Sequence, residues 1–203
     1  MSNPKPVHVL AVVGSLNEKS VTRTIVAATA EAMRNEGCSV DLLDFIHEPL
    51  GLFNPDSVYQ SAMYPSLKAR VEAADVYLLG TPDYHGSISS ALKNFLEHFW
   101  HEFAGKLFVT IVGSHEKGLT VTDQIRTVAR QCYAWSLPYG VSFAEREDIQ
   151  NGEIVSEPLK NRLTMLRRDA RIYGGIIAEQ RRKDLAESGP GFMARHRKTQ
   201  TTI

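Results

Sequence analysis

The residues best suited to chemistry in this chain are short polar side chains that follow two apolar segments. After the apolar segment 7–13 comes Gly14 and then a loop rich in hydroxyl and amide groups. Its candidate binding residues are Ser15, Asn17, Ser20 and Thr22. A helix is expected to begin in this loop, and the first backbone N–H groups of a helix have no partner within it. Hydroxyls beside such N–H groups bind anions, so we predict a phosphate site here.

A second loop follows the apolar segment 76–80, and its composition suits a flat ring. It contains Pro82, Asp83, Tyr84, His85, Gly86 and Ser87. Proline restricts the backbone, Tyr84 offers an aromatic wall, and Gly86 lets the backbone approach a ligand where a side chain would collide. A phosphate site and a ring-binding loop together predict a pocket for a mononucleotide such as FMN.

Ordinary structural roles are the alternative interpretation of these residues. Serine and threonine at 15, 20 and 22 could cap a helix or close a turn, and Tyr84 and His85 could be surface loop residues. We favour ligand binding, because a strand, a glycine and three hydroxyls coincide in the first loop. The chemistry of a bound flavin needs no side-chain nucleophile or triad, so we predict no catalytic side chain.

Alternating apolar and amphipathic segments predict the elements that hold these loops. Strands are expected at 7–13, 39–43, 75–80, 106–113 and 139–144, and helices at 20–35, 66–74, 88–102, 119–133 and 158–179. Five β/α steps joined by right-handed crossovers predict an α/β fold, a three-layer sandwich with a five-stranded parallel sheet of order 2-1-3-4-5. The crevice at its switch point lies between the first and third strands, which carry the two loops.

Length and charge limit the number of domains and the kind of partner. The 203 residues are enough for one domain with a full core, which we place at residues 1–180. Residues 181–203 are expected to form a polar, locally basic tail that is disordered or wraps a neighbouring subunit. Lys and Arg number 23, as do Asp and Glu, so no net charge attracts nucleic acid or a membrane. The expected partner is a small molecule.

Cysteine and histidine spacing gives no sign of a metal site. Cys38 and Cys132 follow no disulfide or metal pattern, so we expect both to be buried apolar side chains. His98 and His101 lie three apart on one expected helix, but no third ligand has a fitting position. The start of the chain lacks a signal-peptide pattern, and no segment has the roughly 18 apolar residues that cross a bilayer. We therefore expect a cytoplasmic protein without a metal.

Two segments resemble the NAD(P)H-dependent FMN reductase family, flavodoxin-like flavoproteins that include quinone, azo and chromate reductases. The segment GSLNEKSVT at 14–22 resembles the GSxRxxSxN loop, and TPDYHGSISSALKNFLEH at 81–98 resembles (S/T)PEYNGSxPxxLKNxxD. The likeness spans residues 7–173. It implies a flavodoxin-like fold with FMN as cofactor and NADPH or NADH as co-substrate.

The resemblance also implies which residues contact FMN. The phosphate would be held by Ser15, Asn17, Ser20, Val21 and Thr22, and the isoalloxazine and ribityl by Pro82, Asp83, Tyr84, His85, Gly86 and Ser87. The third loop, with Ser114, His115 and Gly118, would lie near the pyrimidine end of the flavin.

Three departures from the family pattern concern charge. Asn17 stands where the family commonly has arginine, His85 stands where it commonly has asparagine, and charged residues replace small ones in the third loop. Lys19 and Arg23 are the candidates for the missing positive charge. His115 and Lys117 are candidate contacts to the flavin or to a nicotinamide phosphate.

The implied activity is hydride transfer from NAD(P)H through bound FMN to a quinone, flavin, nitro or azo compound, or metal oxyanion, by ping-pong exchange. A pocket at strand ends is open on one side, so we expect a homodimer or homotetramer, with the loop 48–65 as a candidate second wall. A flavodoxin-type electron carrier and a non-catalytic flavin-sensing or interaction module are the alternatives. Zero net charge argues mildly against the carrier, because carriers usually show one strongly charged face.

Overall fold

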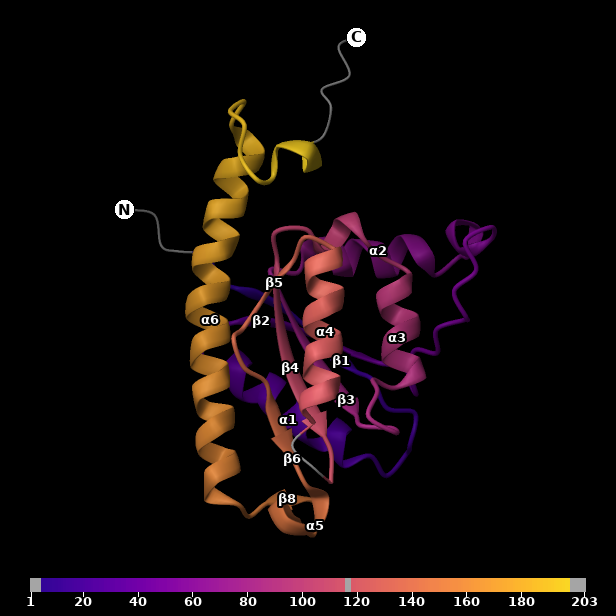
Figure 1. Ribbon diagram of the computed structural model, residues 1–203, viewed down its shortest axis with the longest axis vertical. Helices are drawn as coiled ribbons and strands as arrows, with labels where there is room; N and C mark the ends of the chain where they lie inside the picture. Colours follow the sequence, from indigo (N-terminus) through magenta and orange to yellow (C-terminus); the bar gives the residue numbers. More distant parts are fainter. Residues whose placement is uncertain (1–4, 116–117, 198–203) are drawn as a thin grey trace.

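The computed structural model describes residues 5–115 and 118–197, and shows a parallel sheet between two layers of helices (Figure 1). The strand order is β2-β1-β3-β4-β5, as predicted. The strands of this sheet are β1 (His8–Val13), β2 (Ser39–Asp44), β3 (Val76–Pro82), β4 (Leu107–Gly113), β5 (Trp135–Ser136) and β6 (Val141–Phe143). All of their pairings are parallel, which confirms the predicted doubly wound architecture.

Two groups of helices cover the two faces of the sheet. The helices are α1 (Val21–Asn35), α2 (Tyr64–Ala73), α3 (Ser90–Glu97), α4 (Leu119–Gln131), α5 (Glu145–Asp148) and α6 (Glu157–Ala186). Helices α1 and α6 pack on one face, and α2, α3 and α4 pack on the other (Figure 1). Side chains of β1 alternate between the two cores: Val9 and Ala11 face the first, and Leu10 and Val12 face the second. This double burial explains why the strand is apolar throughout.

The fifth position of the sheet differs from the single strand expected at residues 139–144. Strand β5 pairs with Leu107 and Phe108, whereas β6 pairs with the far end of β4. Pro138 lies between them and has no N–H to donate to a ladder. Two short strands therefore stand where the apolar pattern predicted one.

Other boundaries also differ from the expected ones. Helix α3 ends at Glu97, and a 3-10 turn at His101–Phe103 replaces its expected last turn. An antiparallel hairpin of β7 (Ile149–Gln150) and β8 (Glu153–Ile154) precedes α6. Helix α6 continues to Ala186, so the division expected at residue 180 falls inside it. Further 3-10 turns lie at Val58–Gln60 and Ala194–His196.

The chain after α6 turns back onto the amino-terminal end of the sheet. Met193 is buried, and a Cβ atom on Gly105 would lie 2.6 Å from its Sδ. Arg195 donates to the hydroxyl of Tyr133 at 3.0 Å, and Nε of Arg197 donates to a carbonyl oxygen of α6 at 2.8 Å. The described part of the expected tail thus packs on its own chain, and residues 198–203 lie outside the described residues.

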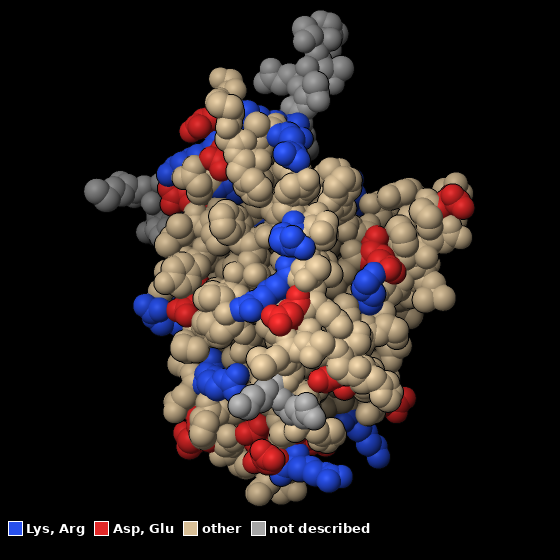
Figure 2. All heavy atoms as spheres, viewed as in Figure 1, with Lys and Arg blue, Asp and Glu red and all other residues tan. Residues whose placement is uncertain are grey.

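Cysteines and surface charge agree with the sequence expectations. Cys38 and Cys132 are free and buried. Burial raises the pKa of both thiols, that of Cys132 to about 11, which confirms their role as packing residues. Figure 2 shows basic and acidic side chains interspersed on the visible face. No helix in the described part of the chain has the length and apolar character needed to span a bilayer.

Candidate functional site

The two predicted loops meet at the carboxyl ends of β1 and β3. Val13 lies beside Gly80, and the N–H of Gly14 donates to the carbonyl oxygen of Gly80 at 2.8 Å. A Cβ atom on Gly80 would lie 2.1 Å from Cγ2 of Val26 on α1, and one on Gly14 would lie 2.6 Å from the Gly80 oxygen. Glycine is therefore required at both positions, because the strand ends and α1 approach each other closely.

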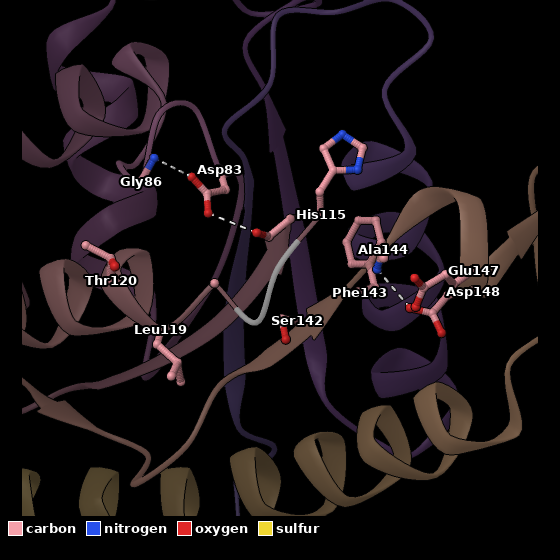
Figure 3. A pocket seen from close by; sticks show the side chains of 12 residues that line it. Asp83, Gly86, His115, Leu119, Thr120, Ser142, Phe143, Ala144, Glu147 and Asp148 are labelled. Atoms are coloured by element: carbon pink, nitrogen blue, oxygen red, sulfur yellow. Dashed lines mark hydrogen bonds between the residues drawn. The ribbon is translucent and has the colours of Figure 1, made fainter.

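Two adjoining cavities open at this end of the sheet. The smaller one, about 190 Å³, is lined by predicted residues of all three loops: Ser15, Asn17, Ser20, Val21 and Thr22, then Pro82, Asp83 and Tyr84, then Ser114 and His115. The larger one, about 930 Å³, shares Asp83, Ser114 and His115 and adds Gly86 and Gly118 (Figure 3). Of the predicted residues that the structure describes, His85 and Ser87 line neither of these two cavities.

The serines of the first loop have capping roles that leave a donor available. Ser20 caps α1, because its Oγ accepts a hydrogen bond from the N–H of Arg23 at 3.3 Å. Oγ of Ser15 accepts from the N–H of Asn17 at 3.4 Å. A hydroxyl has one donor hydrogen and two acceptor lone pairs, so each serine can still donate to a ligand. The capping role and the predicted phosphate role are therefore compatible.

The structure separates the two candidates for the missing positive charge. Lys19 lines the smaller cavity. Arg23 instead directs its guanidinium at Asp44 and at carbonyl oxygens of the loop. Lys19 is therefore the one of this pair that can meet an anion in the cavity.

The second loop is a two-residue hairpin turn. Tyr84 and Ser87 pair as an antiparallel bridge, with N–H to oxygen distances of 3.0 and 3.1 Å. His85 and Gly86 between them both have positive φ, 58° and 75°. A type I′ turn needs positive φ at both positions, which Asn and His adopt more readily than most side chains. His85 thus meets the same backbone requirement as asparagine.

Asp83 and Gln124 hold this turn in place. Oδ1 of Asp83 accepts from the N–H of Gly86 at 2.8 Å, and Oδ2 accepts from the hydroxyl of Ser114 at 2.9 Å (Figure 3). Oε1 of Gln124, on α4, accepts from the hydroxyl of Ser87 at 3.1 Å. Sequence reasoning missed Gln124, because nothing in the pattern of α4 distinguishes it from any other polar residue of an amphipathic helix.

A further wall comes from the segment after β6, which sequence reasoning also missed. Phe143 lines both cavities, Glu145 lines the smaller one, and Glu147 and Asp148 line the larger one (Figure 3). Oδ2 of Asp148 accepts from the N–H of Ala144 at 2.8 Å. This side of the cavities is therefore acidic. This acidic segment follows the strand expected at 139–144, and no pattern in it indicates a binding role.

The remaining candidate residues are the histidines of the 88–102 segment and the charged residues of the third loop. The buried His98 is bonded through Nδ1 to the carbonyl oxygen of Asn94 at 2.8 Å. In residues 5–115 and 118–197, no three His, Cys, Asp or Glu side chains gather in a way that could hold a metal ion. Lys117, a candidate contact of the third loop, lies outside the described residues, as does Glu116.

The sheet order and the cavities at its switch point define a flavodoxin-like α/β protein. Residues 7–148 match the family described as NADPH-dependent FMN reductase, and the chain belongs to this family. It is an NAD(P)H-dependent oxidoreductase with FMN as its cofactor.

A curated relative and two solved structures are similar to this chain. The FMN-dependent NADPH-azoreductase of Staphylococcus aureus is 26% identical over 154 residues, which cover 68% of this chain and 80% of the relative. An apo NADH:FMN oxidoreductase (EMOB) has a TM-score of 0.69 at 16% identity, over 82% of this chain and 89% of that one. The NAD(P)H:(acceptor) oxidoreductase FerB from Paracoccus denitrificans has a TM-score of 0.64 at 16% identity, over 85% and 98%. These structural likenesses support the flavodoxin-like fold.

Proposed function

We propose that FMN binds with its phosphate in the smaller cavity and its ring beside the turn at 84–87. The observation that carries this proposal is the composition of the smaller cavity, where the hydroxyls of Ser15 and Ser20, the amino terminus of α1 and Lys19 converge. A phosphate close to a dianion forms charge-assisted hydrogen bonds with such donors. The residues present therefore fit the phosphorylated end of the cofactor.

The larger cavity supports the position of the ring. Its volume of about 930 Å³ suits a cofactor with a co-substrate, and Leu119 and Phe143 give it apolar walls. Bound FMN supplies the hydride chemistry, while the chain binds, orients and excludes water. Asp83 would orient the ring through the turn that it holds, since its carboxylate accepts from the N–H of Gly86 at 2.8 Å.

The proposed reaction is ping-pong exchange between NAD(P)H and a small flat acceptor. The acceptor classes are quinones, flavins, nitro or azo compounds and metal oxyanions. Two names among the similar proteins support azo compounds and quinones, the azoreductase of Staphylococcus aureus and the NAD(P)H:quinone oxidoreductase of Methanothermobacter marburgensis. One cavity that serves both substrates in turn predicts parallel lines in double-reciprocal plots.

A homodimer or homotetramer is proposed to close the open side of the cavities. The candidate contact is the loop 48–65, in which Leu52 is 90% exposed while the N–H of Phe53 donates to Oδ1 of Asn94 at 2.8 Å. An apolar side chain on an anchored loop suits a subunit contact. Light scattering of the purified protein tests this assembly, and a monomer at micromolar concentration would contradict it.

The activity is tested by visible absorption of the purified protein with added FMN. We expect a flavin spectrum that bleaches with NADPH or NADH in the absence of oxygen and returns when a quinone or azo compound is added. A flavin spectrum that neither nicotinamide bleaches would indicate an electron carrier. No uptake of FMN at all would contradict the proposal and favour a non-catalytic module.

A further inference from the structure

Arg23, in the first turn of α1, is not among the residues that line the two cavities, and its guanidinium binds backbone carbonyl groups and Asp44. Nη1 donates to the carbonyl oxygens of Asn17 and Glu18 at 2.6 and 3.2 Å, and Nη2 donates to that of Ser15 at 3.1 Å. Its two other hydrogen bonds go to Asp44. A guanidinium has five N–H donors, and these five contacts occupy all of them. Arg23 therefore has no donor left for a ligand.

Asp44, at the end of β2, holds this guanidinium in a forked pair. Nε of Arg23 donates to Oδ2 at 2.5 Å, Nη2 donates to Oδ1 at 3.2 Å, and the N–H of Ile46 donates to Oδ1 at 3.1 Å. Burial raises the pKa of Asp44, but the hydrogen bonds from Arg23 and Ile46 outweigh it, so the pKa lies below its ordinary value. The carboxylate therefore stays charged at neutral pH.

We propose that Arg23 and Asp44 are positioning residues that fix the shape of the phosphate loop, an inference that rests on the proposed FMN site. The pair takes up the carbonyl oxygens of Ser15, Asn17 and Glu18, three groups that would repel an anion if they faced the cavity. The loop N–H groups and hydroxyls are left to face the phosphate. The positive charge that faces the phosphate is then the ammonium of Lys19, which lines the smaller cavity.

A second arginine–carboxylate fork on β2 provides a matched control. Arg70, on α2, donates from Nε and Nη2 to the two oxygens of Asp41 at 2.7 and 2.9 Å, and from Nη1 to Glu48 at 2.5 Å. Asp41 lies three residues from Asp44 on the same strand, and its arginine makes no contact with the phosphate loop among the hydrogen bonds of the described residues. Asp41→Asn therefore removes a similar ion pair without touching the proposed function of Asp44.

Amide hydrogen exchange of the flavin-free protein tests the positioning role without any cofactor. In Arg23→Lys and Asp44→Asn, the amides of residues 15–20 are expected to exchange about tenfold faster, because the loop loses its fixed carbonyl partners. Exchange of this loop in Asp41→Asn should match the parent. If the exchange rates of these amides are unchanged in Arg23→Lys and Asp44→Asn, or rise equally in Asp41→Asn, the proposal is overturned.

Titration with FMN and with riboflavin, which lacks the phosphate, tests the link to the ligand. Arg23→Lys and Asp44→Asn should each lose about tenfold or more in FMN affinity and less than about threefold in riboflavin affinity. Parental FMN affinity in Arg23→Lys would show that a positive charge at this position is enough without the forked hydrogen bonds. Equal losses of affinity for FMN and riboflavin would show that the pair has a merely structural role. Either result overturns the proposal.

Lys19→Gln separates the positioning role from direct contact. This variant should lose FMN affinity selectively, while exchange of the loop amides stays at the parental rate. Parental FMN affinity in Lys19→Gln would overturn the assignment of the phosphate-facing charge. If the parent protein binds neither flavin, the proposed function fails, whereas the exchange comparison still decides whether Arg23 and Asp44 fix the loop.

Discussion

The two ends of the sheet are each held by a cation that binds backbone carbonyl groups, but the two cations have different partners. At the carboxyl end, Arg23 is paired with Asp44. At the amino end, the ammonium of Lys106 donates to the carbonyl oxygens of Val71 and Glu72 at 2.7 and 2.8 Å. Lys106 is 2% exposed, and no carboxylate in the described part of the chain is in ion-pair contact with it.

This difference shows what each end of the sheet is built to do. Burial lowers the pKa of Lys106 to about 7, and the charge of Arg181 lowers it further. The carboxylates of Asp75, Glu72 and Glu102 raise this pKa but do not offset the desolvation. The ammonium of Lys106 binds carbonyl oxygens in the last turn of α2, where the carbonyl groups have no partner within the helix. At the other end, Arg23 is paired with the carboxylate of Asp44 beside the proposed phosphate loop. One end therefore carries a packing contact, and the other carries the proposed binding loop.

The largest expected effect comes from breaking the packing end alone. Lys106→Ala should lower the free energy of unfolding by about 3 kcal/mol, because it opens a void and removes the hydrogen bonds to the carbonyl oxygens of Val71 and Glu72. Only the Val71 oxygen keeps a side-chain partner among the described residues, the hydroxyl of Tyr77 at 2.6 Å. Urea denaturation measures this change, and flavin affinity should stay parental. Lys68→Ala is the control, since this partly exposed lysine makes ion pairs at 3.5 and 3.8 Å. A loss of flavin affinity in Lys106→Ala without a loss of stability would show that Lys106 supports flavin binding rather than packing.

The binding end is tested next by removing two hydroxyls. Ser15→Ala combined with Ser20→Ala should weaken FMN binding about 30-fold and riboflavin binding far less, because the lost hydrogen bonds go to the phosphate. Fluorescence titration with both flavins measures the two affinities. Ser188→Ala, at an exposed loop serine outside the loop 48–65, is the control. Equal losses for both flavins would place the two hydroxyls away from the phosphate.

A smaller change per pH unit is expected in the pH dependence of stability. Below pH 7 the folded and unfolded chains both carry the Lys106 proton, whereas between about 7 and 10.5 only the unfolded chain keeps it. The free energy of unfolding therefore rises with pH in this window, at most by about 1.4 kcal/mol per pH unit. Lys106→Met should remove this rise, as measured by urea denaturation across the window. A variant that gains stability with pH as steeply as the parent would exclude Lys106 as the titrating group.

The smallest effect sharpens the view of the ring-binding turn. Gly86→Val should weaken FMN binding about tenfold, because a β-branched residue strains the backbone at a φ of 75°. Gly189→Val is a matched control outside the loop 48–65, since a Cβ atom meets nothing within 4 Å at either glycine and, of the two, Gly86 has positive φ. Equilibrium dialysis measures retention. Parental retention in Gly86→Val would count against the turn as part of the site.

Local patterns predicted the fold and about half of the lining of the smaller cavity, because each pattern describes contacts within a few residues. Val21, Ser114 and His115 came from the family resemblance. The apolar run at 7–13 and the hydroxyls after Gly14 each describe a strand, a turn or a helix start within a few residues. Asp44 and Gln124 were not predicted, since their roles come from hydrogen bonds to residues 21 and 37 positions away in the chain. The split at Pro138 was missed for a related reason: an apolar pattern does not show which N–H groups a neighbouring strand needs.

The long helix α6 determines how this protein can be attached to a solid support. It carries the chain to the end of the sheet opposite the cavities, where Met193 lies against Gly105 (Figure 1). A linker that follows the 3-10 turn Ala194–His196 would therefore leave the protein at the end opposite the cavity mouth. Immobilisation on an electrode through that linker should preserve access for dissolved nicotinamide and dye molecules.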